Sequence, residues 1–188
     1  MGTSKHSILS KSRELFEQHG YGKTTLTDIA KSIGKVKSAL YYYFSGKEEI
    51  FAQIVRDEAE EFWNALESAI ESGDTIEDKL HIYVETRVEL MQKIAKRYSF
   101  LKQEFFELMP IVDQNRKKAD KLEKDAITAL LLSYPKYEGT AESTVRFKAE
   151  MLVNTIKGLE IQMYVTDEVL IDHRSLPIFS DVLLNGIL

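Results

Sequence analysis

The sequence predicts an all-α protein with about nine helices, and three observations lead to that fold class. Only 3 prolines and 9 glycines interrupt the 188 residues, which favours long helices over a fold with many turns. Apolar residues recur at intervals of three and four along most of the chain. No stretch of alternating apolar and polar residues is long enough to predict a strand.

The composition excludes several functional classes. The chain has no cysteine, which rules out disulfides, thiolate zinc sites and cysteine nucleophiles. No apolar run approaches the ~18–20 residues that span a bilayer, and the N-terminus has no signal-peptide character, so we expect a cytoplasmic protein. The four histidines are scattered, and the common hydrolase, metalloprotease and nucleotide-binding motifs are missing from the sequence. We therefore expect no enzyme activity, no cofactor and no metal site.

The net charge of −5 is unevenly distributed along the chain. Residues 1–47 carry 8 Lys/Arg and 3 Asp/Glu, whereas the rest carries 17 Lys/Arg and 27 Asp/Glu. A basic N-terminal quarter on an acidic body is the electrostatic pattern expected of a protein that binds a polyanion such as nucleic acid. Charge alone is equally compatible with a solvated helix face.

The first two predicted helices are delimited by glycines and a capping motif. Helical spacing of apolar residues predicts a helix over about residues 5–19, ending before Gly20. Thr25 and Asp28 have the spacing of a capping box, so a second helix of about two turns begins there. Gly34 ends it, because a tight reversal commonly needs a residue that tolerates positive φ.

A third short helix is predicted over about residues 36–44, and it has two distinct faces. Its apolar face would anchor it to the preceding helices through Val36, Leu40 and Phe44. Its other face carries hydrogen-bonding side chains, namely Lys37, Ser38 and Tyr41. Two short amphipathic helices joined by a glycine-containing turn form a helix-turn-helix, whose second helix enters the major groove of B-DNA. That groove is about 12 Å wide, which admits one α-helix.

Longer helices are predicted for the rest of the chain. Ser45 and Glu48 have the capping spacing expected at the start of the fourth helix, and Pro110 is expected to start or break a helix. The remaining predicted helices cover about residues 45–71, 75–94, 98–108, 110–133, 141–165 and 175–184.

Residues 8–54 closely resemble the N-terminal domain of TetR-family (tetracycline-repressor-like) transcriptional regulators. The matching pieces are Leu15-Phe16, Gly20-Tyr21, Thr24-Thr25, Ile29-Ala30, Gly34, Leu40-Tyr41-Tyr42, Phe44 and Lys47-Glu48. They span about a quarter of the chain, and beyond them the resemblance is one of architecture. It implies a DNA-binding domain over residues 1–46 and a helical effector-binding and dimerisation domain over residues 47–188.

The resemblance also implies which residues meet DNA: Thr25, Lys37, Ser38, Tyr41, Tyr42 and Lys47. Lys37 and Ser38 correspond to positions at base edges, and Tyr41 and Tyr42 to contacts with the phosphate backbone. Lys47 and Thr25 correspond to phosphate contacts, because an ammonium neutralises a phosphate and a hydroxyl donates to its oxygens. The alternative for Lys47 is an ordinary solvated lysine. The alternative for Tyr41 and Tyr42 is packing within the protein.

The sequence departs from the family at the start of the third helix. Lys35 stands where the family usually has an apolar residue, and Val36 stands where a serine or threonine cap is common. We therefore expect this helix to start less well capped than the second one. Ala39 replaces a frequent threonine, which leaves only a methyl group for contact with a thymine methyl.

The body is expected to hold an effector pocket and a dimer face. Aromatic and methionine side chains with one amide are the pocket candidates, although plain core packing is the alternative for each: Phe62, Tyr83, Met91, Phe105, Met109, Phe147, Met151 and Asn154. The predicted helix at 141–165 is apolar on a second side and should be buried on both. In the resembled family the last two helices pair with their copies, which implies a dimer face of Leu152, Ile156, Leu159, Phe179 and Leu183.

These expectations combine into one functional hypothesis. A homodimer presents two reading helices about 34–36 Å apart and binds a pseudo-palindromic double-stranded operator. A small apolar or amphipathic effector then releases this repressor from DNA. The alternative is a helical adaptor that never contacts DNA, which would leave the Lys and Tyr face of the third helix without a role.

Overall fold

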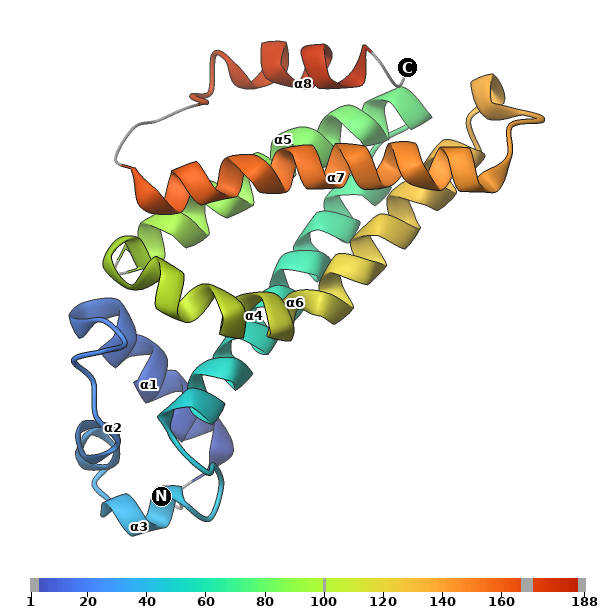
Figure 1. Cartoon of the computed structure of the whole chain (residues 1–188). Helices are drawn as coiled ribbons and strands as arrows, with labels where there is room; N and C mark the ends of the chain where they lie inside the picture. The colour runs from blue at the N-terminus through green and yellow to red at the C-terminus, as the bar shows by residue number, and fades with distance from the viewer. Residues whose placement is uncertain (1–3, 100, 167–170, 186–188) are drawn as a thin grey trace. The chain divides into compact units, whose positions relative to one another are not determined.

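A computed structural model describes residues 4–99, 101–166 and 171–185 of the chain, and every element in these ranges is helical (Figure 1). The all-α fold class is confirmed. The elements are α1 (Lys5–His19), α2 (Leu26–Ser32), α3 (Lys37–Leu40), α4 (Lys47–Glu71), α5 (Ile76–Arg97), α6 (Leu101–Leu132), the 3-10 helix η1 (Pro135–Tyr137), α7 (Glu142–Val165) and α8 (Leu176–Leu184). None of the described helices has the combination of length and apolar side chains that a membrane span requires.

The prediction that Pro110 separates two helices is wrong, because Pro110 lies inside the continuous helix α6. Proline removes one backbone donor, which would have served the carbonyl of Phe106. Both Pro110 and Phe106 are exposed, Phe106 by 89% of its surface, so water can satisfy that carbonyl. The neighbouring Leu108 is fully buried and holds the helix to its own unit.

Helix α4 starts slightly later than predicted, which changes the capping partner of Ser45. Both the backbone N–H and the hydroxyl of Ser45 donate to the carboxylate of Glu49, at 2.5 and 2.7 Å, instead of pairing with Glu48. Because α4 begins at Lys47, Glu49 is its third residue. The acidic member of a capping box occupies this third position.

Two compact units divide the chain. The first contains the residues up to Ala59 together with Ala95–Arg116, and the second contains Glu60–Ile94 together with the residues from Lys117 onward. The domain boundary expected between residues 46 and 47 falls inside the first unit, because the first half of α4 shares its core. A functional division at that point stays a prediction.

The core of the first unit joins the three short helices to the start of α4. The rings of Phe16, Tyr21 and Phe51 lie 5.0–5.9 Å apart between centroids and form an aromatic cluster. Aromatic pairs at such distances contribute packing energy beyond their burial. The aliphatic part of this core is fully buried and comprises Ile8, Ile29, Leu40, Ile50 and Ile54.

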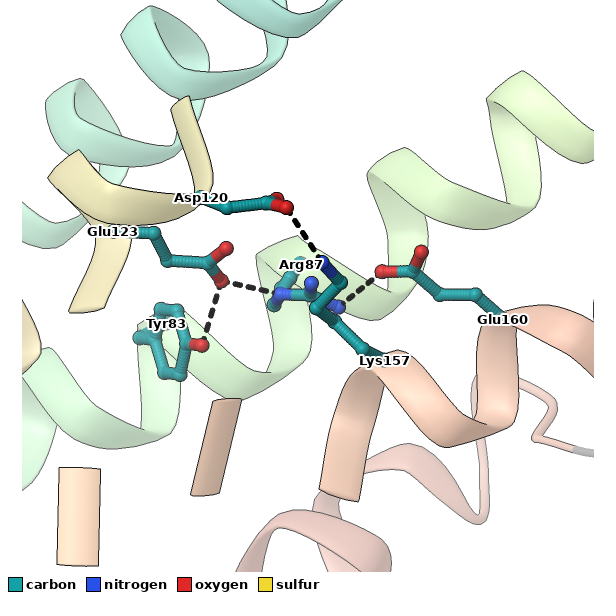
Figure 2. Close-up of polar contacts among 6 residues, drawn as sticks. All are labelled: Tyr83, Arg87, Asp120, Glu123, Lys157 and Glu160. Carbon is teal, nitrogen blue, oxygen red and sulfur yellow. Dashed lines mark hydrogen bonds and ion pairs between the residues drawn. The ribbon is translucent and has the colours of Figure 1, made fainter. Parts of the chain in front are cut away.

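The second unit combines an apolar core with a buried cluster of charged side chains, which the sequence analysis did not anticipate (Figure 2). Arg87 on α5 is fully buried; its Nε donates to the carboxylate of Glu123 on α6, and its Nη1 lies 2.7 Å from the carboxylate of Glu160 on α7. The hydroxyl of Tyr83 also donates to Glu123, at 2.7 Å. Burial, with the neighbouring Glu123 carboxylate, raises the pKa of Tyr83 well above its usual range. Three helices of this unit are therefore linked through one guanidinium group.

Candidate nucleic-acid interface

Local sequence signals position α2 and α3 as a helix-turn-helix. Thr25 caps α2, since its hydroxyl accepts the N–H of Asp28 at 3.2 Å and the Asp28 carboxylate accepts the N–H of Thr25 at 2.9 Å. Gly34 has φ 67°, which lets the chain reverse before α3 as predicted. The N–H groups of Gly34 and Lys35 donate to carbonyls of α2 and close the turn. The buried side chain of Leu40 anchors α3.

The helix α3 is shorter than predicted, and Val36 does not lie on its apolar face. The α-helix covers Lys37–Leu40, and a turn continues to Phe44, whose N–H donates to the carbonyl of Leu40 at 3.0 Å. Val36 precedes the helix in an extended conformation, with φ −92° and ψ 154°, and is 69% exposed. Helical periodicity does not apply at such a residue, so its alignment with Leu40 and Phe44 in the sequence has no counterpart in the fold.

The residues predicted to read DNA are exposed together on α3 and the following turn. Lys37 and Ser38 are exposed, and the Lys37 ammonium lies 5.6 Å from the centroid of the Tyr41 ring. Tyr42 is 85% exposed, and its ring meets that of Tyr43 edge to face at 4.9 Å. This surface offers an ammonium, a hydroxyl and two phenols to a ligand, the donors that phosphate and base edges accept.

The remaining two predicted contacts, Thr25 and Lys47, are engaged within the protein. The Thr25 hydroxyl donates to Asp28 at 2.6 Å, and these hydrogen bonds from Thr25 lower the pKa of the Asp28 carboxyl. The Lys47 ammonium donates to the carbonyls of Tyr21 and Thr24, at 2.7 and 2.9 Å, and lies 4.1 Å from the centroid of the Tyr21 ring. Burial lowers the pKa of Lys47 despite the nearby acidic side chains. Lys47 therefore fastens the turn between α1 and α2 and keeps one donor for an outside acceptor.

A second residue, Glu104, holds the same turn, although no motif in the sequence indicates it. The carboxylate of Glu104 on α6 accepts the N–H groups of Tyr21 and Gly22, at 3.0 and 2.7 Å. A Cβ on Gly22 would lie 2.6 Å from this carboxylate, so a larger residue there would displace it. Glu104 thus holds the N–H groups of the turn while Lys47 holds its carbonyls. Residues more than eighty positions apart leave no periodic or motif signal that could have linked them.

Replacing Glu104 by alanine is expected to lower the thermal midpoint of the protein. Two backbone N–H groups would lose a charged acceptor, and hydrogen bonds to charged groups contribute about 1.5–3 kcal/mol each. We expect the free energy of unfolding to fall by about 2 kcal/mol in total. Glu104 is only partly buried, so water replaces part of the lost interaction. Circular dichroism during heating measures the midpoint. The control is Asp113→Ala, which removes an exposed carboxylate from the same helix and the same unit, and an equal loss in both variants would refute the role given to Glu104.

The predicted pocket residues divide between the two units. Phe105 and Met109 belong to the first unit, whereas the other candidates belong to the second. Tyr83 and Met91 are buried there, and Phe62 is partly buried. The placement of the remaining three as interior pocket residues is wrong for the single chain, since all are exposed on one side of α7: Phe147, Met151 and Asn154.

The predicted dimer residues also need correction. Leu152 and Ile156 are buried in the core of their own unit, so they cannot meet a second copy. Leu159, Phe179 and Leu183 are partly buried and pack against the same core. The structure thus reverses the exposure expected for the two apolar sides of α7, because the side predicted for the pocket is exposed and two residues predicted for the dimer lie in the core.

Comparison with known proteins supports the resemblance seen in the sequence. Residues 8–54 match the family described as "Bacterial regulatory proteins, tetR family". The biofilm operon icaADBC HTH-type negative transcriptional regulator IcaR of Staphylococcus aureus (strain Newman) is 44% identical over 52 residues, which is 28% of this chain and 28% of IcaR. The HTH-type transcriptional repressor AcnR of Corynebacterium diphtheriae is 28% identical over 103 residues, which is 51% of this chain and 53% of AcnR. The chain thus matches about half or less of the length of these relatives.

The fold likeness extends along the chain. The crystal structure of a transcriptional regulator of the TetR/AcrR family from Thermobifida fusca superimposes with a TM-score of 0.69 and 22% identity, covering 97% of both chains. Residues 8–54 therefore match the tetR family of bacterial regulatory proteins, and the chain has the fold of the TetR/AcrR-family regulator from Thermobifida fusca.

Proposed function

We propose that this chain is a cytoplasmic transcriptional repressor that binds a pseudo-palindromic DNA operator as a homodimer and is released by a small molecule. The observation that carries the proposal is the exposed set of hydrogen-bond donors on α3 and its turn, supported from beneath by the buried Leu40. The basic charge of residues 1–47 supports a polyanionic partner. Repression is supported by IcaR and AcnR, which are described as a negative regulator and a repressor.

The polar side chains divide by chemistry into base and phosphate contacts. The Lys37 ammonium and the Ser38 hydroxyl suit acceptors on base edges. The phenol groups of Tyr41 and Tyr42 suit phosphate oxygens, which position a protein on the duplex without reading its sequence. Lys47 is proposed to contribute its remaining donor to a phosphate while it holds the turn.

Exposed apolar residues on the last two helices support the homodimer. On α7 (orange in Figure 1) an exposed stripe contains Phe147, Met151, Asn154, Gly158, Ile161 and Val165. On α8 (red) Ile178 and Val182 are exposed one turn apart. Contiguous exposed apolar surface of this kind marks an interaction site, and two copies would bury each other's stripe.

The effector is proposed to be an apolar or amphipathic molecule bound within the second unit. Phe62, Tyr83 and Met91 supply aromatic and thioether surface there. Helix α4 runs through both units, so a change in its tilt can carry the signal to the DNA-binding helices. A coupling free energy of about 1–3 kcal/mol would change operator affinity roughly 5–150-fold.

Tyr42→Ala tests DNA binding at the residue least involved in the fold. Loss of one phosphate hydrogen bond, at about 1 kcal/mol, is expected to weaken affinity about fivefold. The thermal midpoint should stay unchanged, because the side chain is 85% exposed. The measurement is a fluorescence anisotropy titration on fragments of the source genome selected by binding to the wild-type protein.

The control for this test is Phe106→Ala, which removes another exposed aromatic ring from the same unit, on α6 instead of the turn after α3. Its affinity should equal that of the wild type. Equal affinities for all three proteins would remove the tyrosine contact from the proposal. Failure of the wild-type protein to prefer any genomic fragment over random duplex would instead favour an adaptor that does not bind DNA.

A further inference from the structure

The side chain of Val36 contributes little packing and no capping hydrogen bond to the free protein. It is 69% exposed, so most of its surface remains in water. It occupies the N-cap position of α3, where no side-chain hydrogen bond is formed. Ser4 and Thr25 occupy the same position of α1 and α2, and each closes a capping box. A serine in place of Val36 would be expected to stabilise α3, so the valine needs an explanation outside the free protein.

Val36 is exposed beside residues that are proposed to contact DNA. It directly precedes Lys37 and Ser38, which are both exposed. Its extended backbone ends at the first residue of the helix, so it shares the start of α3 with the residues proposed to meet base edges. Tyr41 and Tyr42 add exposed ring surface at the other end of this segment. The apolar side chain of Val36 is therefore expected to lie close to the ligand that α3 contacts.

The chemistry of the major groove identifies the group that a valine can recognise. Thymine places a C5 methyl group there, whereas the other recognition groups of the bases are hydrogen-bond donors and acceptors. A β-branched side chain has few rotamers to lose on contact. We propose that Val36 reads one thymine in each operator half-site through contact between its methyl groups and the C5 methyl of the base. This inference rests on the proposed function, since it requires α3 to lie in the major groove.

The test removes the thymine methyl and the valine methyls separately and together. Each thymine of a fragment selected by the full-length protein is replaced in turn by deoxyuridine, which keeps the base pair and lacks only the methyl group. Wild-type affinity is expected to fall about fourfold at one thymine in each half-site, the effect of one methyl group leaving an apolar contact. Val36→Ser should bind thymine and deoxyuridine equally at that position. Val36→Ile, which keeps the apolar group, should retain the discrimination.

Three results would overturn the inference, and they differ from a failure of the proposed function. Wild-type binding that is insensitive to deoxyuridine at every position removes the methyl contact. Sensitivity that persists in Val36→Ser gives the contact to another side chain, such as that of Ala39. A Val36→Ser thermal midpoint below that of the wild type shows that Val36 has a structural role after all. If the wild type binds no fragment, the proposed function fails before any thymine is replaced.

Discussion

Arg87→Ala is expected to lower the unfolding free energy of the second unit by about 3–5 kcal/mol, a large fraction of ordinary domain stability. Arg87 is fully buried between two carboxylates, and the side chains of Glu123 and Glu160 are only 4% and 6% exposed. Removing the guanidinium takes away the positive charge that both carboxylates share, in a site with little water. The hydroxyl of Tyr83 can still donate to Glu123, but it carries no charge.

The chain provides its own probe for this measurement. Trp63 is the one tryptophan of the sequence and lies in the core cluster of the second unit. Urea titration followed by tryptophan fluorescence therefore reports the unfolding of that unit. Far-ultraviolet circular dichroism of the same samples follows the helices of the whole chain.

A neighbouring ion pair supplies the control. Lys157 and Asp120 are also in contact, at 2.7 Å, but their side chains are 25% and 19% exposed (Figure 2). Solvent screens this pair more than it screens the Arg87 cluster, so Lys157→Ala should cost less than Arg87→Ala. A variant that replaces Arg87, Glu123 and Glu160 together by apolar residues and also carries Tyr83→Phe, so that the Tyr83 hydroxyl does not lose its acceptor, should recover most of the lost stability. Equal costs for the two alanine variants would refute the assignment of Arg87 as a buried counterion.

Local signals explain why many helix boundaries could be predicted. Two capping boxes are formed by residues only three positions apart, so both partners can be seen in the sequence. They are Thr25 with Asp28 and Thr75 with Asp78. The turn at Gly34 is local in the same way. The start of α3 was less predictable, because the periodic rule placed Val36 on the apolar face although it lies before the first helical turn.

Long-range contacts explain what the sequence could not provide at the candidate site. The exposed residues Lys37, Ser38 and Tyr42 follow from helical spacing and the resemblance. The bonds from Lys47 and Glu104 to the turn between α1 and α2 join segments far apart in the chain, and nothing in their immediate sequence marks them. The buried charges around Arg87 are equally invisible, since charged residues at helical spacing ordinarily indicate a solvated face.

The reversal on α7 has a related cause. The helix is apolar on two sides, and its periodicity indicates that both sides should be buried. Periodicity does not indicate which of the two sides packs against the rest of its own unit. The structure assigns Leu152 and Ile156 to the core, which leaves the side containing Phe147, 62% exposed, for another partner. A second apolar face on α7 could therefore be predicted from the sequence, but which of the two faces is buried in the unit could not.

Ile161→Glu is expected to convert the proposed dimer into monomers at micromolar concentration. Ile161 is 53% exposed at the centre of the stripe's second half, beside the exposed Gly158, where helices can approach closely. In a two-fold interface each substitution appears twice, so two unpaired carboxylates would be buried against apolar surface. The fold of the single chain should survive, because the new charge is placed on a side chain already in contact with water.

Light scattering with size-exclusion chromatography distinguishes the two states, because a dimer has about twice the 21.6 kDa mass of the chain. Ala65→Glu introduces the same charge at an exposed position of α4 and should leave the dimer intact. Operator affinity should fall together with the dimer in Ile161→Glu, since one reading helix contacts only one half-site. An Ile161→Glu protein that remains dimeric and still binds its operator would place the subunit contact on a different face, and the exposed stripe of α7 would then need another partner.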